Sequence, residues 1–214
     1  MVRTFFEEVA ATNLKVRIMF SQNARQAQGL TAEDIEHGYY KLYYQFIKHA
    51  FGLAYLPPQP ERTRLRLYFD QFPDTGEKVE RFKGFIAGLQ RSREFKPARL
   101  RIEREDIAEV RSHEHVILQC LDIVLGAMSF RLNDMHREKP PGESKRGKRT
   151  IAKERLYKLI VQEIRALYPN FNIGVSTGTN GGPKDYWAGC YRHWCFEARN
   201  SEYQPHLSKR GQNK

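Results

Sequence analysis

SHEHVILQCLDIVLGAMSFRLN, residues 112–133, is the stretch around which the rest of the chain is expected to fold. Apolar residues occupy nearly every face of the helix that this segment predicts, so we expect most of the helix to be buried. Gln119 and Asp122 interrupt the apolar run one helical turn apart, on the same face. A buried carboxylate without a partner is costly, so Asp122 is expected to face a cation, a helix end or a metal ion. The sequence does not decide whether Asp122 forms a structural ion pair or belongs to a functional site.

Strands and helices are predicted to alternate on either side of this helix. The predicted strands have alternating apolar residues and lie at 14–20, 64–72 and 98–112. We expect the third strand region to break near Glu105 and Asp106. The other predicted helices lie at 31–53, 77–90 and 150–168. Thr31 is the expected N-cap of the first of these. This order of elements favours an α/β domain with a sheet that is at least partly parallel.

Composition changes along the chain divide it into four parts. We predict an α/β core at 1–136, a basic flexible linker at 137–149, a C-terminal helix with short strands at 150–199 that pack on the core, and a disordered tail at 200–214. The linker contains two prolines, two glycines and six basic residues against two acidic ones. Such a segment is expected to be exposed.

The chain is strongly basic, with 36 Lys and Arg residues against 25 Asp and Glu residues and a formal net charge of +11. This charge favours a polyanionic partner, with nucleic acid as the first candidate. The linker is a candidate contact with the phosphate backbone, although a solvated tether explains it equally well.

Targeting features are not visible in the sequence. No apolar run approaches the roughly 20 residues that cross a bilayer, so no membrane partner is expected. The first residues show no export signal, and three cysteines without a framework spacing favour a reducing compartment. We therefore predict a cytoplasmic protein.

Asp70 and Asp122 are the best candidates for chemistry. Asp70 comes at the end of a predicted strand, where ligands bind in open α/β sheets. Two carboxylates that converge on a cleft would suit Mg²⁺ or Mn²⁺, which prefer oxygen ligands. Such an ion can activate water for phosphodiester cleavage. The residues therefore suggest a metal site at Asp70 and Asp122.

Other features favour structural interpretations. Cys190, His193 and Cys195 lack a second ligand pair, so a zinc site there is disfavoured. The glycine-rich stretch at 178–182 lacks the pattern of a phosphate-binding loop and is given no nucleotide role. Four tyrosines could stack on bases but have the helical spacing typical of packing; they are Tyr39, Tyr40, Tyr43 and Tyr44.

Four segments of the chain carry a resemblance to a known family. They read LRLYFDQF at 65–72, IAEVRSHEHVILQCLDIVLGA at 107–127, FNIGVSTG at 171–178 and YRHWCF at 191–196. This order is similar to the bacterial and phage family called domain of unknown function 3800, over about residues 5–196. The resemblance implies a ribonuclease H-like fold, a mixed sheet flanked by helices, and metal-dependent nuclease activity.

The resemblance also assigns roles to individual residues. Asp70 matches the acid that ends a central strand of the family. Ser112, Gln119, Asp122 and Gly126 match its Ser followed by a helix with a Gln-x-x-Asp step and a Gly. It follows that Asp70 and Asp122 would be catalytic metal ligands for Mg²⁺ or Mn²⁺. Gln119 and Ser112 would support Asp122 and the start of its helix.

The chain departs from the family at its beginning. The family starts with a strand carrying Asp-Glu-Ser-Gly, which this sequence lacks. The resemblance therefore implies either a true start upstream of Met1 or an N-terminally truncated form without the first catalytic acid. Two functions are therefore expected as alternatives. One is a ribonuclease H-like nuclease that cleaves phosphodiester bonds, with little activity in this form. The other is a non-catalytic remnant that binds nucleic acid or a protein partner.

Overall fold

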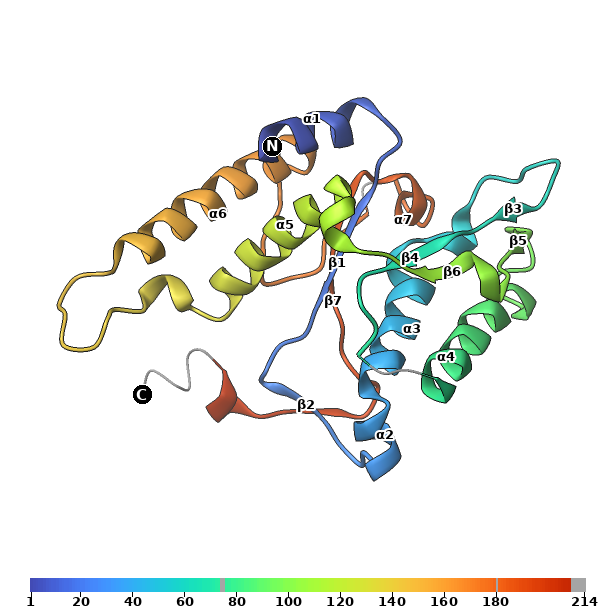
Figure 1. Cartoon of the computed structure of the whole chain (residues 1–214), viewed down its shortest axis with the longest axis horizontal. Helices are drawn as coiled ribbons and strands as arrows, with labels where there is room; N and C mark the ends of the chain where they lie inside the picture. Colours follow the sequence, from blue (N-terminus) through green and yellow to red (C-terminus); the bar gives the residue numbers. More distant parts are fainter. Residues whose placement is uncertain (74–75, 180, 209–214) are drawn as a thin grey trace.

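The chain folds into alternating helices and short strands, which confirms the predicted α/β class (Figure 1). The computed structural model describes residues 1–73, 76–179 and 181–208. The helices are α1 (Val2–Ala11), α2 (Ala32–Glu36), α3 (Gly38–Ala50), α4 (Glu77–Gly88), α5 (Val116–Leu132), α6 (Lys148–Leu167) and α7 (Asp185–Ala188). The strands are β1 (Val16–Phe20), β2 (Arg25–Ala27), β3 (Thr63–Arg64), β4 (Leu67–Phe69), β5 (Leu100–Arg101), β6 (Ile107–Glu109), β7 (Tyr191–Cys195) and β8 (Ser201–Tyr203).

The strands of the described residues form four separate pairs instead of the one mixed sheet that we predicted. β1 pairs in parallel with β7, with Val16 opposite Tyr191 and Phe20 opposite Cys195. β3 with β5 and β4 with β6 are also parallel, and β2 with β8 is antiparallel. Parallel neighbours need a long crossover, and α4 lies on the crossover of both pairs in the middle of the chain.

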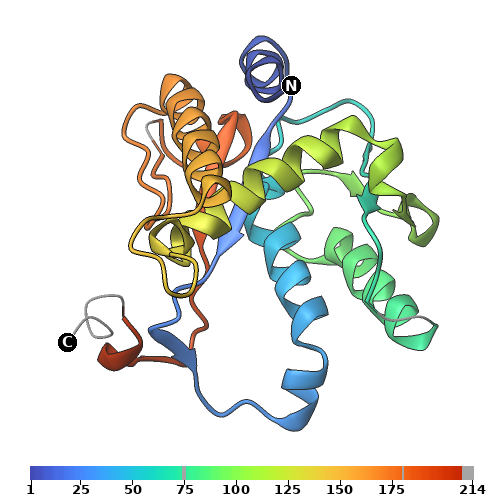
Figure 2. The same cartoon turned by 60° about the vertical axis from the view of Figure 1, so that its left-hand side comes forward.

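Two hydrophobic clusters stabilise the fold. The first joins α3 and α4 to β4, β5 and β6, and we call this region the α4 lobe. The second joins α1, β1, α5, α6 and β7, and we call this region the α6 lobe. Figure 2 shows α6 on one side of β1, α3 and α4 on the other, and α5 crossing in front of the strand. The two lobes therefore bury their apolar side chains separately.

Two buried arginines lie where the lobes meet. Arg192 of β7 donates to the carbonyl oxygen of Ala50 at the end of α3, at 3.1 Å. Arg17 of β1 donates to carbonyl oxygens at the end of α7, including those of Tyr186 at 3.3 Å and Gly189 at 2.7 Å. Burial, and then the neighbouring Arg192, lowers the pKa of Arg17 to about 10. Cations suit the carboxyl ends of helices, so both arginines hold helix ends against the β1–β7 pair.

Helix α5 is less buried than its sequence predicts. Cys120, Val124 and Met128 are buried against α1 and α6, but the opposite face is open, with Leu125 51% exposed and Asp122 and Gly126 exposed beside it. The prediction of a mostly buried helix was therefore wrong for one face. An apolar sequence shows that a helix can be buried on all sides, but the number of neighbouring elements decides how much of it is covered.

Several element boundaries differ from the predictions. The helix expected at 31–53 is divided at His37 into α2 and α3, although Thr31 caps it as predicted, in a capping box with Asp34. α6 begins at Lys148, within the predicted linker. The tail predicted to be disordered contains β8 and a 3-10 turn at Pro205–Leu207. Residues 209–214 of that tail lie outside the described residues.

In the described ranges, no helix is both long enough and apolar enough to cross a membrane.

Candidate functional site

Asp70 and Asp122 both lie on the surface. Asp70 directly follows β4, as predicted, and its side chain is exposed. Asp122 lies on the open face of α5 and is exposed too, so the expected burial of this carboxylate was wrong. Neither carboxylate forms a hydrogen bond or ion pair with the residues that the structure describes. The same residues contain no group of three or more His, Cys, Asp or Glu side chains that could hold a metal ion. The donor set for Mg²⁺ or Mn²⁺ is therefore not assembled, and metal binding by Asp70 and Asp122 stays a prediction.

Gln119 and Ser112 act at the start of α5. The Gln119 amide donates to the carbonyl oxygens of His113 at 2.8 Å and Ser112 at 3.4 Å. These carbonyls belong to a 3-10 turn at Ser112–Glu114, and α5 itself begins after His115. Ser112 therefore lies before the start of α5, and the N-cap of this helix is His115. Gln119 supports the helix start, as expected, through bonds that do not involve Asp122.

Among the described residues, the buried carboxylate is that of Asp106. This residue is 5% exposed, and its carboxylate accepts two hydrogen bonds from the Arg64 guanidinium, at 2.8 and 2.9 Å. The bond to Arg64 lowers the pKa of Asp106, against the opposing effect of desolvation. Arg66 lies 3.7 Å from the same carboxylate. This ion pair ties β3 to the turn before β6, and the alternation of Arg64 and Arg66 was the only sequence signal for it.

Cys190, His193 and Cys195, where a zinc site was disfavoured, lie on β7 and directly before it. His193 is fully buried, and its ring packs at a tilt against Phe20 with 4.5 Å between centroids. Burial lowers the pKa of His193 to about 4, so the ring is neutral at pH 7. Burial also raises the pKa of the Cys195 thiol, which disfavours the thiolate that zinc requires.

The tyrosine cluster on α3 contributes to packing, the interpretation that its spacing favoured. Tyr40 is buried against Phe82, with 5.1 Å between ring centroids, and Tyr43 lies 5.5 Å from Phe69. Tyr39 is 39% exposed. These rings form the aromatic part of the α4-lobe core.

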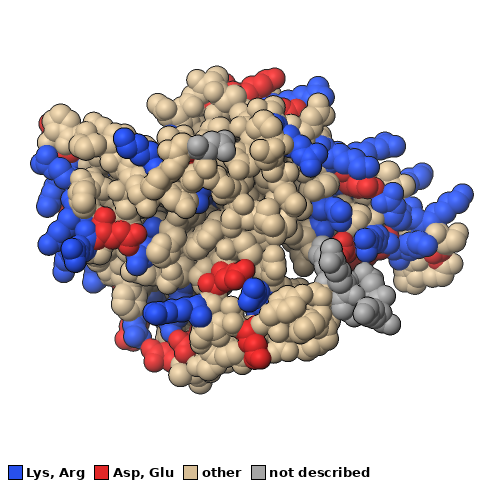
Figure 3. Space-filling view, turned by 180° about the vertical axis from the view of Figure 1, so that it is seen from behind, with Lys and Arg blue, Asp and Glu red and all other residues tan. Residues whose placement is uncertain are grey.

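A surface rich in cations lies over α6 and the loop that precedes it. Residues 137–158 contain nine basic and three acidic residues, so they contribute +6 (9 − 3) of the net charge of +11. We call their nine basic side chains the α6 basic surface. Figure 3 shows Lys and Arg side chains at this end of the molecule, on the right, and a second group at the opposite end. The members are Arg137, Lys139, Lys145, Arg146, Lys148, Arg149, Lys153, Arg155 and Lys158.

The geometry of α6 aligns part of this surface. Ile160 and Ile164 are buried against the core, whereas Lys148, Arg155 and Lys158 lie on the exposed side. These three cations extend over about 15 Å of helix. Such a row can run beside several successive phosphates of a nucleic acid strand.

One acid holds the preceding loop in place. Arg146 donates to Glu154 at 2.6 Å and to the carbonyl oxygen of His136 at 2.9 Å. Lys158 lies 3.2 Å from the same Glu154. Within the described part of the chain, the other members of the α6 basic surface have no carboxylate partner. The loop is therefore anchored at its end while most of its cations stay available.

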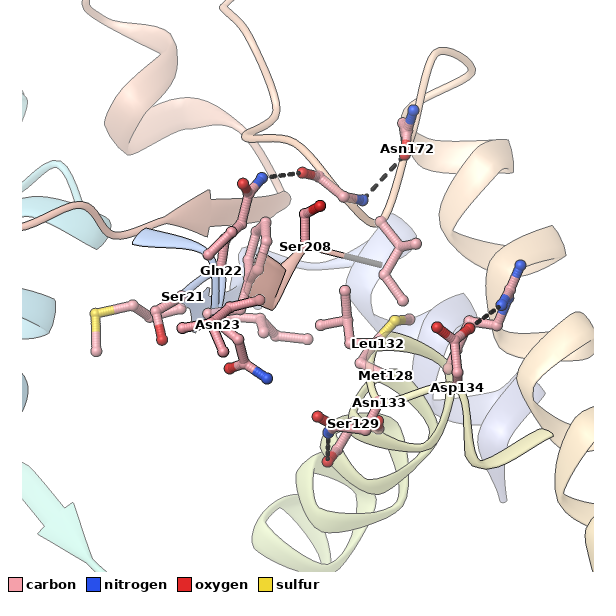
Figure 4. Close-up of a pocket in the computed structure, with 18 of the residues that line it drawn as sticks. Ser21, Gln22, Asn23, Met128, Ser129, Leu132, Asn133, Asp134, Asn172 and Ser208 are labelled. Atoms are coloured by element: carbon pink, nitrogen blue, oxygen red, sulfur yellow. Dashed lines mark hydrogen bonds and ion pairs between the residues drawn. The ribbon is translucent and has the colours of Figure 1, made fainter. Parts of the chain in front are cut away.

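The sequence did not predict a cleft that opens where β1 ends. It has a volume of about 1090 Å³ and lies between the residues after β1 and the C-terminal half of α5. Figure 4 shows Ser21, Gln22 and Asn23 on the strand side and Ser129 and Asn133 on the α5 side. The cleft depends on residues from four distant parts of the chain, so no local pattern signals it.

Comparison with known proteins identifies neither a family nor a function. No family model, no curated protein and no solved structure matches this chain. The resemblance to domain of unknown function 3800 therefore stays a prediction.

Proposed function

We propose that this protein binds nucleic acid through the α6 basic surface without reading the sequence of bases. The observation that carries the proposal is a group of nine cations among which only Arg146 and Lys158 have a carboxylate partner in the described chain, the shared Glu154. Unpaired cations on a rigid helix can neutralise phosphates and release their counterions. This surface consists of Lys and Arg side chains and has no arranged set of groups that would recognise the edges of bases. We therefore expect it to contact the phosphate backbone of the nucleic acid.

The sequence also predicts a ribonuclease H-like fold and metal-dependent cleavage. The parallel strand pairs linked through α4 are compatible with a ribonuclease H-like fold. Metal-dependent cleavage requires Asp70 and Asp122 to share a metal ion, and both side chains are exposed without a described partner. Binding is therefore the function that the geometry supports best.

The test is fluorescence anisotropy with single- and double-stranded DNA and RNA over a series of salt concentrations. A triple variant, Lys148→Gln with Arg149→Gln and Arg155→Gln, removes three cations without described carboxylate partners. Each lost phosphate contact should reduce the slope of log K against log salt by about 0.7 to 0.9, so we expect a reduction of about 2 to 3.

The matched control removes three cations from the α4 lobe that are already in ion pairs. Lys78, Arg81 and Arg101 lie within 3.4 Å of acidic side chains, so Lys78→Gln with Arg81→Gln and Arg101→Gln should leave the slope unchanged. Absence of binding by the wild type at low salt would refute the proposal. Equal slopes for the two triple variants would show that net charge, not this surface, causes the binding.

A further inference from the structure

The cleft beside β1 has the size and position of a ligand site. Its volume of about 1090 Å³ is in the range of pockets for small molecules. It lies beyond the carboxyl end of β1, which is parallel to β7, and crevices at such strand ends commonly bind ligands in α/β proteins. Met128 and Ile173 contribute to an apolar part of its lining.

The polar part of the lining consists mainly of hydroxyl and amide groups. The side chains of Ser21 and Asn23 form no hydrogen bond with the described residues, and both line the cleft. An Asn amide offers a donor pair and an acceptor side by side, which matches the edge of a nucleobase. An apolar lining with amide groups at its margin therefore fits a flat heterocycle that has polar edges.

The cleft is continuous with the α6 basic surface. Arg137 belongs to that surface, lines the cleft and is exposed. It has no carboxylate partner among the residues described, whereas Arg131 on the same side is held by Asp134 at 3.2 Å. A phosphate bound by Arg137 would therefore place the attached nucleotide at the cleft. Tyr203, 49% exposed, adds an aromatic ring to the lining, with the Arg25 guanidinium 5.5 Å from the ring centroid, and aromatic rings with nearby arginines are common contacts for unpaired bases.

We propose that the cleft accepts an unpaired nucleotide from a strand bound on the α6 basic surface, an inference that rests on the proposed function. The bases of an intact duplex are stacked and paired, so they cannot enter a cleft in this way. The protein should consequently prefer single strands to duplexes of the same sequence.

The experiment fills the cleft without changing its charge. Leu125 lines the cleft and is 51% exposed on α5, so Leu125→Trp should occupy part of the space for the base. Ile117 is 53% exposed on the same helix and lies outside the cleft, which makes Ile117→Trp the matched control. Affinity for a short fluorescein-labelled single DNA strand and for its duplex is measured at one low salt concentration. Circular dichroism checks that each variant is folded.

The expected result is a loss of about tenfold in single-strand affinity for Leu125→Trp, in the range of one stacked base. Duplex affinity should change by less than about twofold, because the phosphate contacts remain. Ile117→Trp should match the wild type on both probes. If Leu125→Trp is not folded, Asn23→Ala replaces it, with an expected loss of about fivefold from one lost hydrogen bond.

Two other results would overturn the inference in distinguishable ways. A folded Leu125→Trp or Asn23→Ala that binds the single strand as tightly as the wild type would exclude the cleft and leave binding by α6 intact. A wild-type protein that binds neither probe would refute the proposed function and this inference together.

Discussion

The two lobes carry their positive charge in different ways. In the α4 lobe, most basic side chains are paired with acids, as in Arg64 with Asp106 at 2.7 Å and Lys78 with Glu36 at 2.9 Å. In the α6 basic surface, Glu154 is the one acid in an ion pair with a described cation. The charge of a paired cation is already balanced by its neighbouring acid, whereas an unpaired cation can still attract a negatively charged partner. Net charge alone could not distinguish these two ends of the molecule.

The largest effect is expected at the junction of the lobes. Gly52 has φ +66° and precedes a 3-10 turn at Leu53–Tyr55, and a Cβ at this position would overlap the backbone of Tyr186. Gly52→Ala should therefore lower the free energy of unfolding by about 3 kcal/mol or more, measured by urea denaturation. Gly126→Ala on α5 is the control, because a Cβ there meets open space. The control should be stabilised by up to about 1 kcal/mol. Equal stability of the two variants would contradict the close contact.

The second largest effect is a loss of stability in acid, which we expect from His193 on β7 of the α6 lobe. The pKa of His193 is lowered to about 4, against about 6.5 for an unfolded chain. The unfolded chain therefore binds a proton first, and stability that is fully present above pH 6.5 is lost as the pH falls toward 4. The loss should reach about 3 kcal/mol. His193→Phe should remove most of this dependence between pH 6.5 and 4.5, which denaturation at several pH values measures. Burial also lowers the pKa of His49 and of His136, so a smaller dependence should remain. An unchanged pH profile would contradict a neutral, buried ring.

A smaller effect is expected when an acidic residue is placed on α6, so that cations there form ion pairs like those of the α4 lobe. Ala152 is exposed on α6, four residues after Lys148 and three before Arg155. Ala152→Glu should pair with these cations and weaken nucleic acid binding about tenfold at low salt, as expected for one lost phosphate contact. Anisotropy measures the change, and Ala152→Gln controls for the size of the side chain. Equal affinities for the Glu and Gln variants would show that unpaired charge does not determine binding.

The smallest effect is expected at Asp122. Its side chain is exposed and has no hydrogen bond or ion pair with the described residues, so Asp122→Asn should leave the melting temperature unchanged. With Mg²⁺ or Mn²⁺, wild type, Asp122→Asn and Asp70→Asn should all show little or no cleavage of labelled DNA or RNA. Cleavage by the wild type that is lost in both variants would establish the metal site that the sequence predicted.

Local patterns in the sequence determined most of the elements. Alternating apolar residues predicted β1, and Thr31 as an N-cap predicted the start of α2, where the structure has a capping box with Asp34. The break near Asp106 was also predicted, and the structure has a 3-10 turn at Arg104–Asp106 there. These features depend on interactions between residues at most four positions apart, so the sequence shows them directly.

Only the tertiary structure decided which of these elements meet. It exposed Asp122, because α5 has neighbours on one face, and it buried Asp106 beside Arg64, 42 residues away. It also paired β1 with β7 from opposite ends of the chain and formed the cleft at their carboxyl ends. Burial and pairing depend on the elements that pack together, and a residue's sequence neighbours do not specify those distant partners.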